Sequence, residues 1–493
     1  MKFQIYYILI IVASFYGCLQ DEGNYGYLDL NEVTEITGIE EMYSIAKYDD
    51  TLRINPEVSF KLEEEGDYHY EWQVNHSVLN ELSRKYENNA LVISTDKNLE
   101  YIANHEVPYT ELFATFKVIN NETGVTKTKG FQIRVQNAYQ YGYYFLTEEV
   151  DENSELFMVR NNWKTVDNVF EATTGLTLKG KPFGMDTYDS STGAELIIFT
   201  SDPETVGAVM DLNEVQYKWP ANKCFHEGNL GSEPIVVDWF KFEPNSGDFY
   251  TIINGDFHYT NKWQAGDHMP YIGINFPDLD ESVDKANEIC WGFSLIHGTD
   301  PGSLYVAGSW GATSKVEIEG EPLVVPGECL FMAGEPGKYA FYGIDTYVFT
   351  RENGVVNELV VNALDYGGLT FTMKAEREFV GSSLVDDETI FIASASQRYF
   401  YFSAANKVYR YNFDAPADAP TVMFELPEGQ QISYLKMQTK KRGWSFVDEK
   451  FIVATYDNSG DNHGSIYYVN LDGTMDKTYE HVCGKVVDMV SKF

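Results

Sequence analysis

The sequence predicts an all-β protein, in which an Ig-like β-sandwich at residues 27–137 precedes a β-propeller-like domain of about seven blades at residues 138–493. The chain contains 35 Tyr and 31 Phe, two residue types that favour strands. Its apolar runs are short and separated by polar turns, and no long run shows the helical period of about 3.6 residues. In the second part, aromatic hairpins recur at the spacing of a repeat fold.

The N-terminus has the features of a bacterial lipoprotein signal peptide. A lysine precedes an apolar run at residues 6–13, which is too short to span a bilayer, and a glycine stands just before Cys18. We therefore expect residues 1–17 to be removed, Cys18 to carry the lipid, and residues 18–26 to form a tether. The aromatic residues at positions 15 and 16 are bulkier than usual there, so a secretory signal followed by a chance cysteine is the alternative.

Charge and composition exclude several classes of function. The chain has 36 basic and 75 acidic residues, a net charge of −39. Phosphate backbones and anionic lipid headgroups repel such a chain, so we expect no nucleic-acid partner and attachment to a membrane only through acyl chains. Hydrophobic residues make up 44% of the chain, which indicates packed cores rather than disorder.

The remaining cysteines do not form a recognisable motif. Cys224, Cys290, Cys329 and Cys483 are widely and irregularly spaced, and the absence of a CxxC pair excludes a zinc ribbon or a redox dithiol. One or two disulfides and buried free thiols are both compatible with this spacing.

The β-sandwich is predicted from alternating strands around a central tryptophan. Strand-like runs occur at residues 68–74, which include Trp72, and at 112–119. A polar turn and a returning strand at 131–135 follow the second run, as in an Ig-like sandwich. Residues 77–86 have a helical or loop-like composition.

The propeller is predicted from seven hairpins, each made of two β-rich runs joined by a polar turn. They recur about every 51 residues, close to the blade length of about 50 residues in kelch-type propellers. Each hairpin would supply the inner or middle strands of one blade, and a pair of ordinary β-sandwiches is the alternative. The hairpins begin near Tyr143, Glu195, Phe249, Leu304, Tyr339, Tyr399 and Lys450.

Both ends of the chain resemble the PKD-like lipoproteins of gut Bacteroidetes. The resemblance rests on residues 21–27 (DEGNYGY) and 31–33 (NEV), and on residues 399–413 and 484–490 near the C-terminus. It implies an N-terminal PKD-like domain and a lipoprotein anchored in the outer membrane at the cell surface, since Asp21 and Glu22 are similar to the export signal of these bacteria. It further implies an accessory role beside a TonB-dependent importer and its SusD-like lipoprotein. The resemblance supplies no catalytic residue.

Motifs of known chemistry are absent. The sequence has no GxSxG elbow, HExxH pair, P-loop or dinucleotide-binding glycine motif, so we predict no cofactor, no metal and no catalytic residue. Residues 457–464 are rich in oxygen ligands but lack the glycine and glutamate positions of an EF-hand, and a plain hairpin turn is the better interpretation.

Two segments are candidates for ligand contact. Residues 254–268 form a polar segment with His258, Tyr259 and Trp263, which is typical of a ligand-contacting loop; an ordinary inter-strand loop is the alternative. Trp310 lies between small residues at a hairpin tip, where an exposed indole could bind a sugar or peptide, or could fold back onto the core.

The sequence therefore favours a non-enzymatic, surface-exposed outer-membrane lipoprotein. Its ligand would be a small molecule, a glycan or a peptide, and its protein partner a TonB-dependent importer complex. A surface enzyme that degrades glycans or peptides on a propeller fold is the alternative, and a scaffold without a ligand is a third hypothesis.

Overall fold

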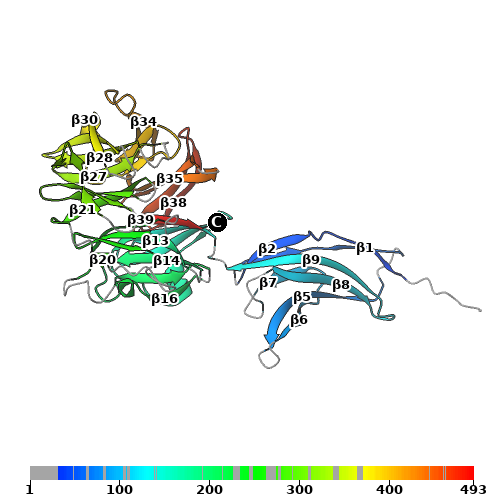
Figure 1. Cartoon of the computed structure of the whole chain (residues 1–493). Helices are drawn as coiled ribbons and strands as arrows, with labels where there is room; N and C mark the ends of the chain where they lie inside the picture. The colour runs from blue at the N-terminus through cyan, green and yellow to red at the C-terminus, as the bar shows by residue number, and fades with distance from the viewer. Residues whose placement is uncertain are drawn as a thin grey trace, which may run out of the picture. The chain divides into compact units, whose positions relative to one another are not determined.

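The chain divides into two compact units, residues 1–138 and 139–493 (Figure 1). Among the described residues, no helix has the length and apolarity needed to cross a membrane. The computed structural model describes residues 31–47, 49–62, 66–80, 85–103, 107, 111–137, 139, 141–190, 193–213, 215–225, 234–243, 248–261, 274–275, 279–290, 293–308, 313–336, 343–363, 370–442, 445–458, 460 and 462–492.

The first unit is built on a five-stranded sheet that packs against two short strand pairs. Along the sheet the order is β2-β9-β8-β5-β6, with β2 parallel to β9 and the other neighbours antiparallel. The sheet strands are β2 (Met42–Lys47), β5 (Tyr68–Asn80), β6 (Lys85–Ser94), β8 (Glu111–Asn120) and β9 (Thr126–Asn137), and the pairs are β1 (Val33–Thr37) with β4 (Glu57–Phe60) and β3 (Thr51–Ile54) with β7 (Leu99–Ile102).

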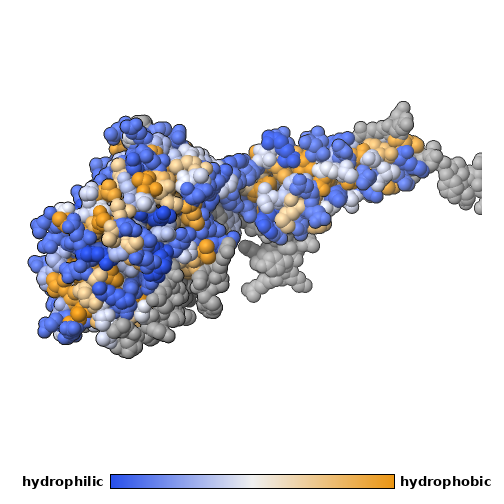
Figure 2. Space-filling model, turned by 90° about the horizontal axis from the view of Figure 1, so that it is seen from above, coloured by the Kyte–Doolittle hydropathy of each residue, from blue (hydrophilic) through white to orange (hydrophobic). Residues whose placement is uncertain are grey.

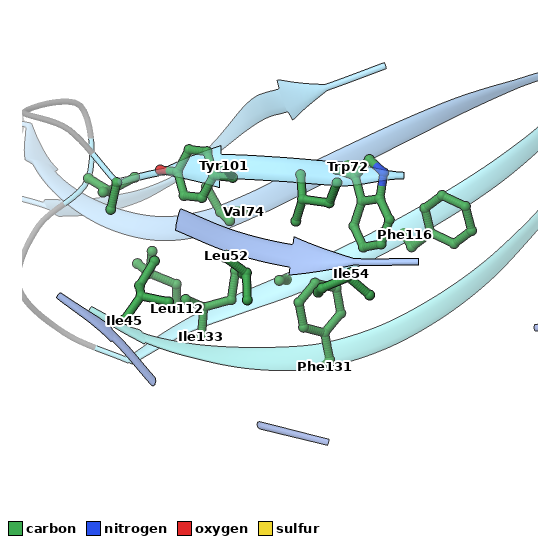
Figure 3. Packing of buried hydrophobic residues seen from close by; sticks show 14 of the residues in the cluster. Ile45, Leu52, Ile54, Trp72, Val74, Tyr101, Leu112, Phe116, Phe131 and Ile133 are labelled. Carbon is green, nitrogen blue, oxygen red and sulfur yellow. The ribbon is translucent and has the colours of Figure 1, made fainter. Parts of the chain in front are cut away.

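Alternation of side chains along these strands forms the core of the first unit. In β8 every second residue is buried, so that Leu112 and Phe116 point inward while Phe113 on the opposite face is 55% exposed. Trp72 of β5 is fully buried, and its ring centroid lies 4.3 Å from that of Phe116 (Figure 3). The predicted strands at 68–74, 112–119 and 131–135 thus lie in β5, β8 and β9.

The expectation of a helical or loop-like segment at residues 77–86 is wrong in its described part. The ladder between β5 and β6 continues to the pair Asn80–Lys85, so backbone pairing holds this polar stretch as a strand. A cross-strand partner thus overrides the local preference of the sequence.

The described residues of the second unit contain seven four-stranded antiparallel sheets, which confirms the all-β prediction. The first sheet joins the two ends of the unit: β12 (Thr165–Val166), β11 (Ser154–Arg160), β10 (Gly142–Glu148) and the C-terminal β39 (Lys485–Lys492). The next three sheets are β13 (Pro182–Ser190), β14 (Gly193–Thr200), β15 (Gly207–Asp211) and β16 (Gln216–Pro220); β17 (Val237–Glu243), β18 (Asp248–Ile253), β19 (Asp256–Asn261) and β20 (Ile274–Asn275); and β21 (Val283–Cys290), β22 (Phe293–Gly298), β23 (Leu304–Gly308) and β24 (Thr313–Lys315).

Three further sheets complete the series. They are β27 (Glu328–Gly334), β28 (Ile344–Glu352), β29 (Val355–Ala363) and β30 (Phe371–Glu378); β31 (Phe391–Ala393), β32 (Tyr399–Ala404), β33 (Lys407–Asn412) and β34 (Thr421–Glu425); and β35 (Gln431–Arg442), β36 (Ser445–Tyr456), β37 (Gly464–Asn470) and β38 (Met475–Cys483). The small elements are a two-stranded sheet of β25 (Glu317–Ile318) and β26 (Glu321–Pro322), a short helix α2 (Val169–Thr174), and the 3-10 turns η1 (Ala221–Cys224) and η2 (Ser382–Leu384).

Consecutive sheets pack against each other, the seventh sheet packs against the first, and one edge strand of each sheet takes part in both of its contacts. We call these strands the inner strands: β39, β13, β17, β21, β27, β31 and β35. Figure 1 shows the C-terminal β39 beside β13, although the two lie about 300 residues apart in the sequence. The described parts of the seven predicted hairpins fall in seven different four-stranded sheets. For the hairpin near Tyr339 this part is a single strand, β28, because residues 337–342 lie outside the described residues.

Polar side chains connect neighbouring inner strands. Asp488 of β39 accepts a hydrogen bond from the Met185 backbone N–H, and Asp186 of β13 accepts one from the Phe242 N–H. Lys436 of β35 donates to the Met489 carbonyl at 3.0 Å. These bonds satisfy backbone N–H and C=O groups of the inner strands, which have no neighbouring strand on one side.

A buried histidine of the fourth sheet, His297 in β22, contacts the connection that leads into β27 of the fifth sheet. Both ring nitrogens of His297 face acceptors, Nδ1 at 2.7 Å from Asp284 and Nε2 at 2.8 Å from the Val325 carbonyl. Burial alone would lower the pKa of His297, but the hydrogen bond and charge of Asp284, together with the carbonyl, raise it above its usual value. The protonated ring, which donates twice, is therefore the form that the fold favours.

We expect the stability that His297 supplies to be lost as pH rises. The folded pKa is above the unfolded value of about 6.5, so this contribution is fully present below that pH and disappears as pH passes the folded pKa. Urea midpoints of the native chain and of His297→Gln, measured from pH 5.5 to 8.5, should therefore differ most at the acidic end. The other titrating groups are common to both proteins, so their contributions cancel in the difference between the two midpoints. A difference that does not change with pH would contradict a raised pKa of His297.

Candidate functional site

The structure places two of the four predicted ligand-contacting residues. His258 lies in β19, is 2% exposed, and its Nδ1 has no hydrogen-bond partner among the described residues; burial lowers its pKa. Tyr259 is also in β19, so residues 256–261 of the expected loop at 254–268 form a strand, and residues 262–268 lie outside the described residues. Trp263 and Trp310, like the lipidation candidate Cys18, lie outside the described residues. Ligand contact by these residues stays a prediction.

Three of the cysteines are buried free thiols. Cys224, Cys329 and Cys483 are not bonded to one another, and burial raises the pKa of each, which keeps them protonated and inert. Within the described ranges, no group of three or more His, Cys, Asp or Glu side chains could hold a metal ion.

A surface cavity of about 560 Å³ lies where the first and seventh sheets meet. We call it the rim cavity, because turns at one end of the two sheets form its walls. One wall is the β10–β11 turn with Glu148, Glu149 and Glu152; the other is the end of β36 and the turn after it, with Tyr456 and Asp457. Lys485, which pairs with Glu148 across β39 and β10, also lines the cavity. The same two turns contribute the other described lining residues, Val150, Asn458, Gly460 and His463.

Two glycines allow the sheets to meet beneath the rim cavity. A Cβ at Gly464 would lie 2.0 Å from the Gly484 carbonyl oxygen, and one at Gly484 would lie 2.5 Å from Glu149 Oε1. Backbone and carboxylate therefore occupy the space that a side chain would need, and the close approach of these segments depends on both glycines.

The lining of the rim cavity is held by specific polar contacts. Lys181 Nζ lies 3.4 Å from Glu148 and 3.2 Å from Glu152, and the Thr147 hydroxyl donates to Glu149 at 2.6 Å. The Tyr456 hydroxyl donates to Glu388 at 2.8 Å. Burial, this hydrogen bond and the charges of Glu388 and Glu148 raise the pKa of Tyr456 to about 12, so the phenol stays protonated.

A second polar cluster lies on the inner strands. It consists of Asp186, Asp488, Tyr434 and Lys436, from β13, β39 and β35. Burial raises the pKa of Asp186 to about 6, with a further contribution from the charge of Asp488, against the hydrogen bonds from backbone N–H groups and the charge of Lys436. Burial likewise raises the pKa of Asp488, opposed by Lys436 and by the Tyr434 hydroxyl.

The residues of the inner cluster could transfer protons, and they also hold neighbouring sheets together. A carboxyl group that titrates near neutrality beside a tyrosine and a lysine can donate or accept a proton. The same two carboxylates also accept backbone N–H groups of the neighbouring sheets, which is a structural role. Sequence inspection missed the inner cluster, because its members come from opposite ends of the unit. It noticed the segment at 457–464, part of which lines the rim cavity, but interpreted it as a plain hairpin turn.

Comparison with known proteins finds one family. Residues 18–182 match the PKD-like family. The match begins at Cys18, includes the whole first unit as described, and ends at the first residue of β13. No curated protein matches the chain.

Solved structures resemble the chain only at low identity. A quinonprotein alcohol dehydrogenase-like protein from Bacteroides thetaiotaomicron is 12% identical with a TM-score of 0.45, over 94% of this chain and 99% of that chain. A virginiamycin B lyase from Staphylococcus aureus is 11% identical with a TM-score of 0.35, over 61% and 84%. A DUF4784 family protein from Bacteroides caccae is 9% identical with a TM-score of 0.30, over 79% and 95%. With TM-scores below 0.5, these likenesses assign no function to the chain.

Proposed function

We propose that the chain is a non-enzymatic lipoprotein of the outer-membrane surface. Residues 139–493 would form a seven-bladed β-propeller that captures a nutrient ligand, and a lipid on Cys18 would hold the protein beside a TonB-dependent importer complex. The seven sheets and the contact of the last with the first support the propeller, and the PKD-like match at residues 18–182 supports the setting. The ligand is a small molecule, a glycan fragment or a peptide.

The rim cavity carries the proposal of ligand capture. Its volume of about 560 Å³ lies within the range of roughly 300–1,000 Å³ that is usual for small-molecule sites. Its walls are polar turns on strands buried in the core, an arrangement in which a rigid scaffold positions a variable binding surface. The face of the second unit that Figure 2 shows is mostly hydrophilic, with small separate hydrophobic patches.

Binding to the full-length lipoprotein tests the proposal. Thermal shifts would be recorded in detergent against mono- and oligosaccharides, amino acids, short peptides, diamines and dicarboxylates. We expect a shift with at least one class, lost in Asn458→Trp, which fills the rim cavity, and kept in Thr421→Trp at an exposed position of β34. No shift with any class would contradict capture. Incorporation of a fatty-acid analogue that persists after Cys18→Ala would contradict the anchor.

The inner cluster favours a second function, a surface hydrolase for glycans or peptides. Asp186, with a pKa of about 6, could act as a general acid or base. Turnover of a glycan or peptide by the full-length protein that is abolished in Asp186→Asn or Asp488→Asn would establish this function and replace the first proposal.

A further inference from the structure

The rim cavity contains an ammonium group that the protein itself supplies. Lys485 Nζ lies 4.3 Å from the centre of the Tyr456 ring, and both residues line the cavity. An ammonium group over a tyrosine face is held by the negative charge density of the ring. Among the described residues, no carboxylate lies within 4 Å of this Nζ. The aromatic face therefore holds Lys485 without a direct ion pair.

The charges around the cavity favour a cation. Four carboxylates line it, those of Glu148, Glu149, Glu152 and Asp457, while the described basic lining residues are one lysine, Lys485, and one histidine, His463. Lys181 offsets part of this charge from outside the lining, while Glu388 adds a further carboxylate behind Tyr456. In a chain with a net charge of −39, such a concave acidic surface concentrates cations and repels anions.

We propose that the rim cavity binds a small ligand with a primary ammonium group, which replaces the Lys485 ammonium on the Tyr456 ring. This proposal rests on the proposed function, because it names the ligand class of the same cavity. An ammonium is favoured over a metal ion, since the described residues offer no metal-binding group, and over an anion, since the carboxylates outnumber the cations. Displacing Lys485 has a low cost, because its side chain can move into water without breaking an ion pair.

Calorimetric titration of the full-length chain in detergent with 1,5-diaminopentane tests the ligand class. The neutral 1,5-pentanediol and the anionic glutarate, which have the same chain length, are the matched ligands. We expect only the diamine to bind, with an affinity that falls as salt is raised. Equal binding of the diol, or no binding of the diamine, would overturn the proposal.

Variants of the two contacting residues test the site. Tyr456→Leu should weaken diamine binding roughly threefold to tenfold, because it removes the aromatic face. Lys485→Gln should strengthen it several-fold by removing the internal competitor, while Lys407→Gln, which changes the net charge equally at a distant ion pair in β33, should leave it unchanged. Unchanged affinity in Tyr456→Leu, or equal effects of the two lysine variants, would contradict displacement of Lys485.

The ligand screen separates this proposal from the proposed function. If a neutral sugar or peptide binds and is blocked by Asn458→Trp while the diamine does not bind, capture in the cavity stands and the ammonium assignment fails. If no probe binds, both fail. Thermal unfolding of each variant, with a midpoint near that of the native chain, shows that lost affinity does not come from lost structure.

Discussion

Replacing Glu358 with alanine is expected to lower the free energy of unfolding of the second unit by about 3 kcal/mol. Glu358 is fully buried in β29, where its carboxylate binds Arg377 of β30 through two N–H groups and accepts a hydrogen bond from the Tyr411 hydroxyl at 2.6 Å. The substitution leaves the guanidinium and the hydroxyl without this partner. This loss is at the lower end of the range of about 3–5 kcal/mol for a broken buried ion pair. The reason is that the Arg377 side chain is 31% exposed and can be hydrated.

The matched control lies in the same sheet. Glu328 pairs with Arg351 between β27 and β28, again as direct cross-strand neighbours, but its side chain is 60% exposed. Glu328→Ala should cost less than about 1 kcal/mol, since the exposed Glu328 carboxylate is already hydrated and Arg351 keeps Asp387 at 2.7 Å as a partner. Urea unfolding followed by hydrogen exchange of residues 344–378 would measure both variants. Equal losses in the two would show that burial of Glu358 does not determine its contribution.

Replacing Trp72 with alanine is expected to destabilise the first unit by about 3–5 kcal/mol. The side chain is fully buried in β5 and packs against Phe116 and Phe131 (Figure 3). Its Nε1 donates to the Asp96 carbonyl at 2.9 Å. Alanine would leave a large cavity and a carbonyl without its donor.

Phe113→Ala on the outer face of the same sheet is the control. Phe113 is 55% exposed, so its truncation should cost less than about 1 kcal/mol. Hydrogen exchange of the strands at 111–120 and 126–137 reports on this unit separately from the other. A small effect of Trp72→Ala on these strands would mean that the core tolerates the cavity.

Burial explains which strands could be recognised in the sequence. The middle strands of each sheet are covered on both faces by neighbouring sheets, so β10 and β37 are buried at almost every position and appear as continuous apolar runs. Outer strands such as β30 and β38 are mostly exposed and carry charged residues, which conceals them among turns. The repeat of buried hairpins could therefore be recognised in the sequence, while the exposed outer strands of each four-stranded sheet could not.

The candidate sites could not be derived in the same way. Glu148 and Lys485 belong to the rim cavity only because the C-terminal β39 completes the first sheet, and Asp186 meets Asp488 for the same reason. No local pattern marks such pairs, since their distance along the chain is more than 300 residues. The search for motifs instead selected His258 for its polar surroundings, and the fold buries that ring inside a sheet.

The sequence by itself determined the all-β class, the positions of the core strands and the strong negative charge, because each depends on local residue type and spacing. Only the tertiary structure decided which side chains share a site. The contact of the seventh sheet with the first brings Tyr456 and Asp457 against Glu148 and Lys485, and burial between inner strands shifts the pKa of Asp186. Both effects arise from long-range packing, which the order of residues along the chain does not display.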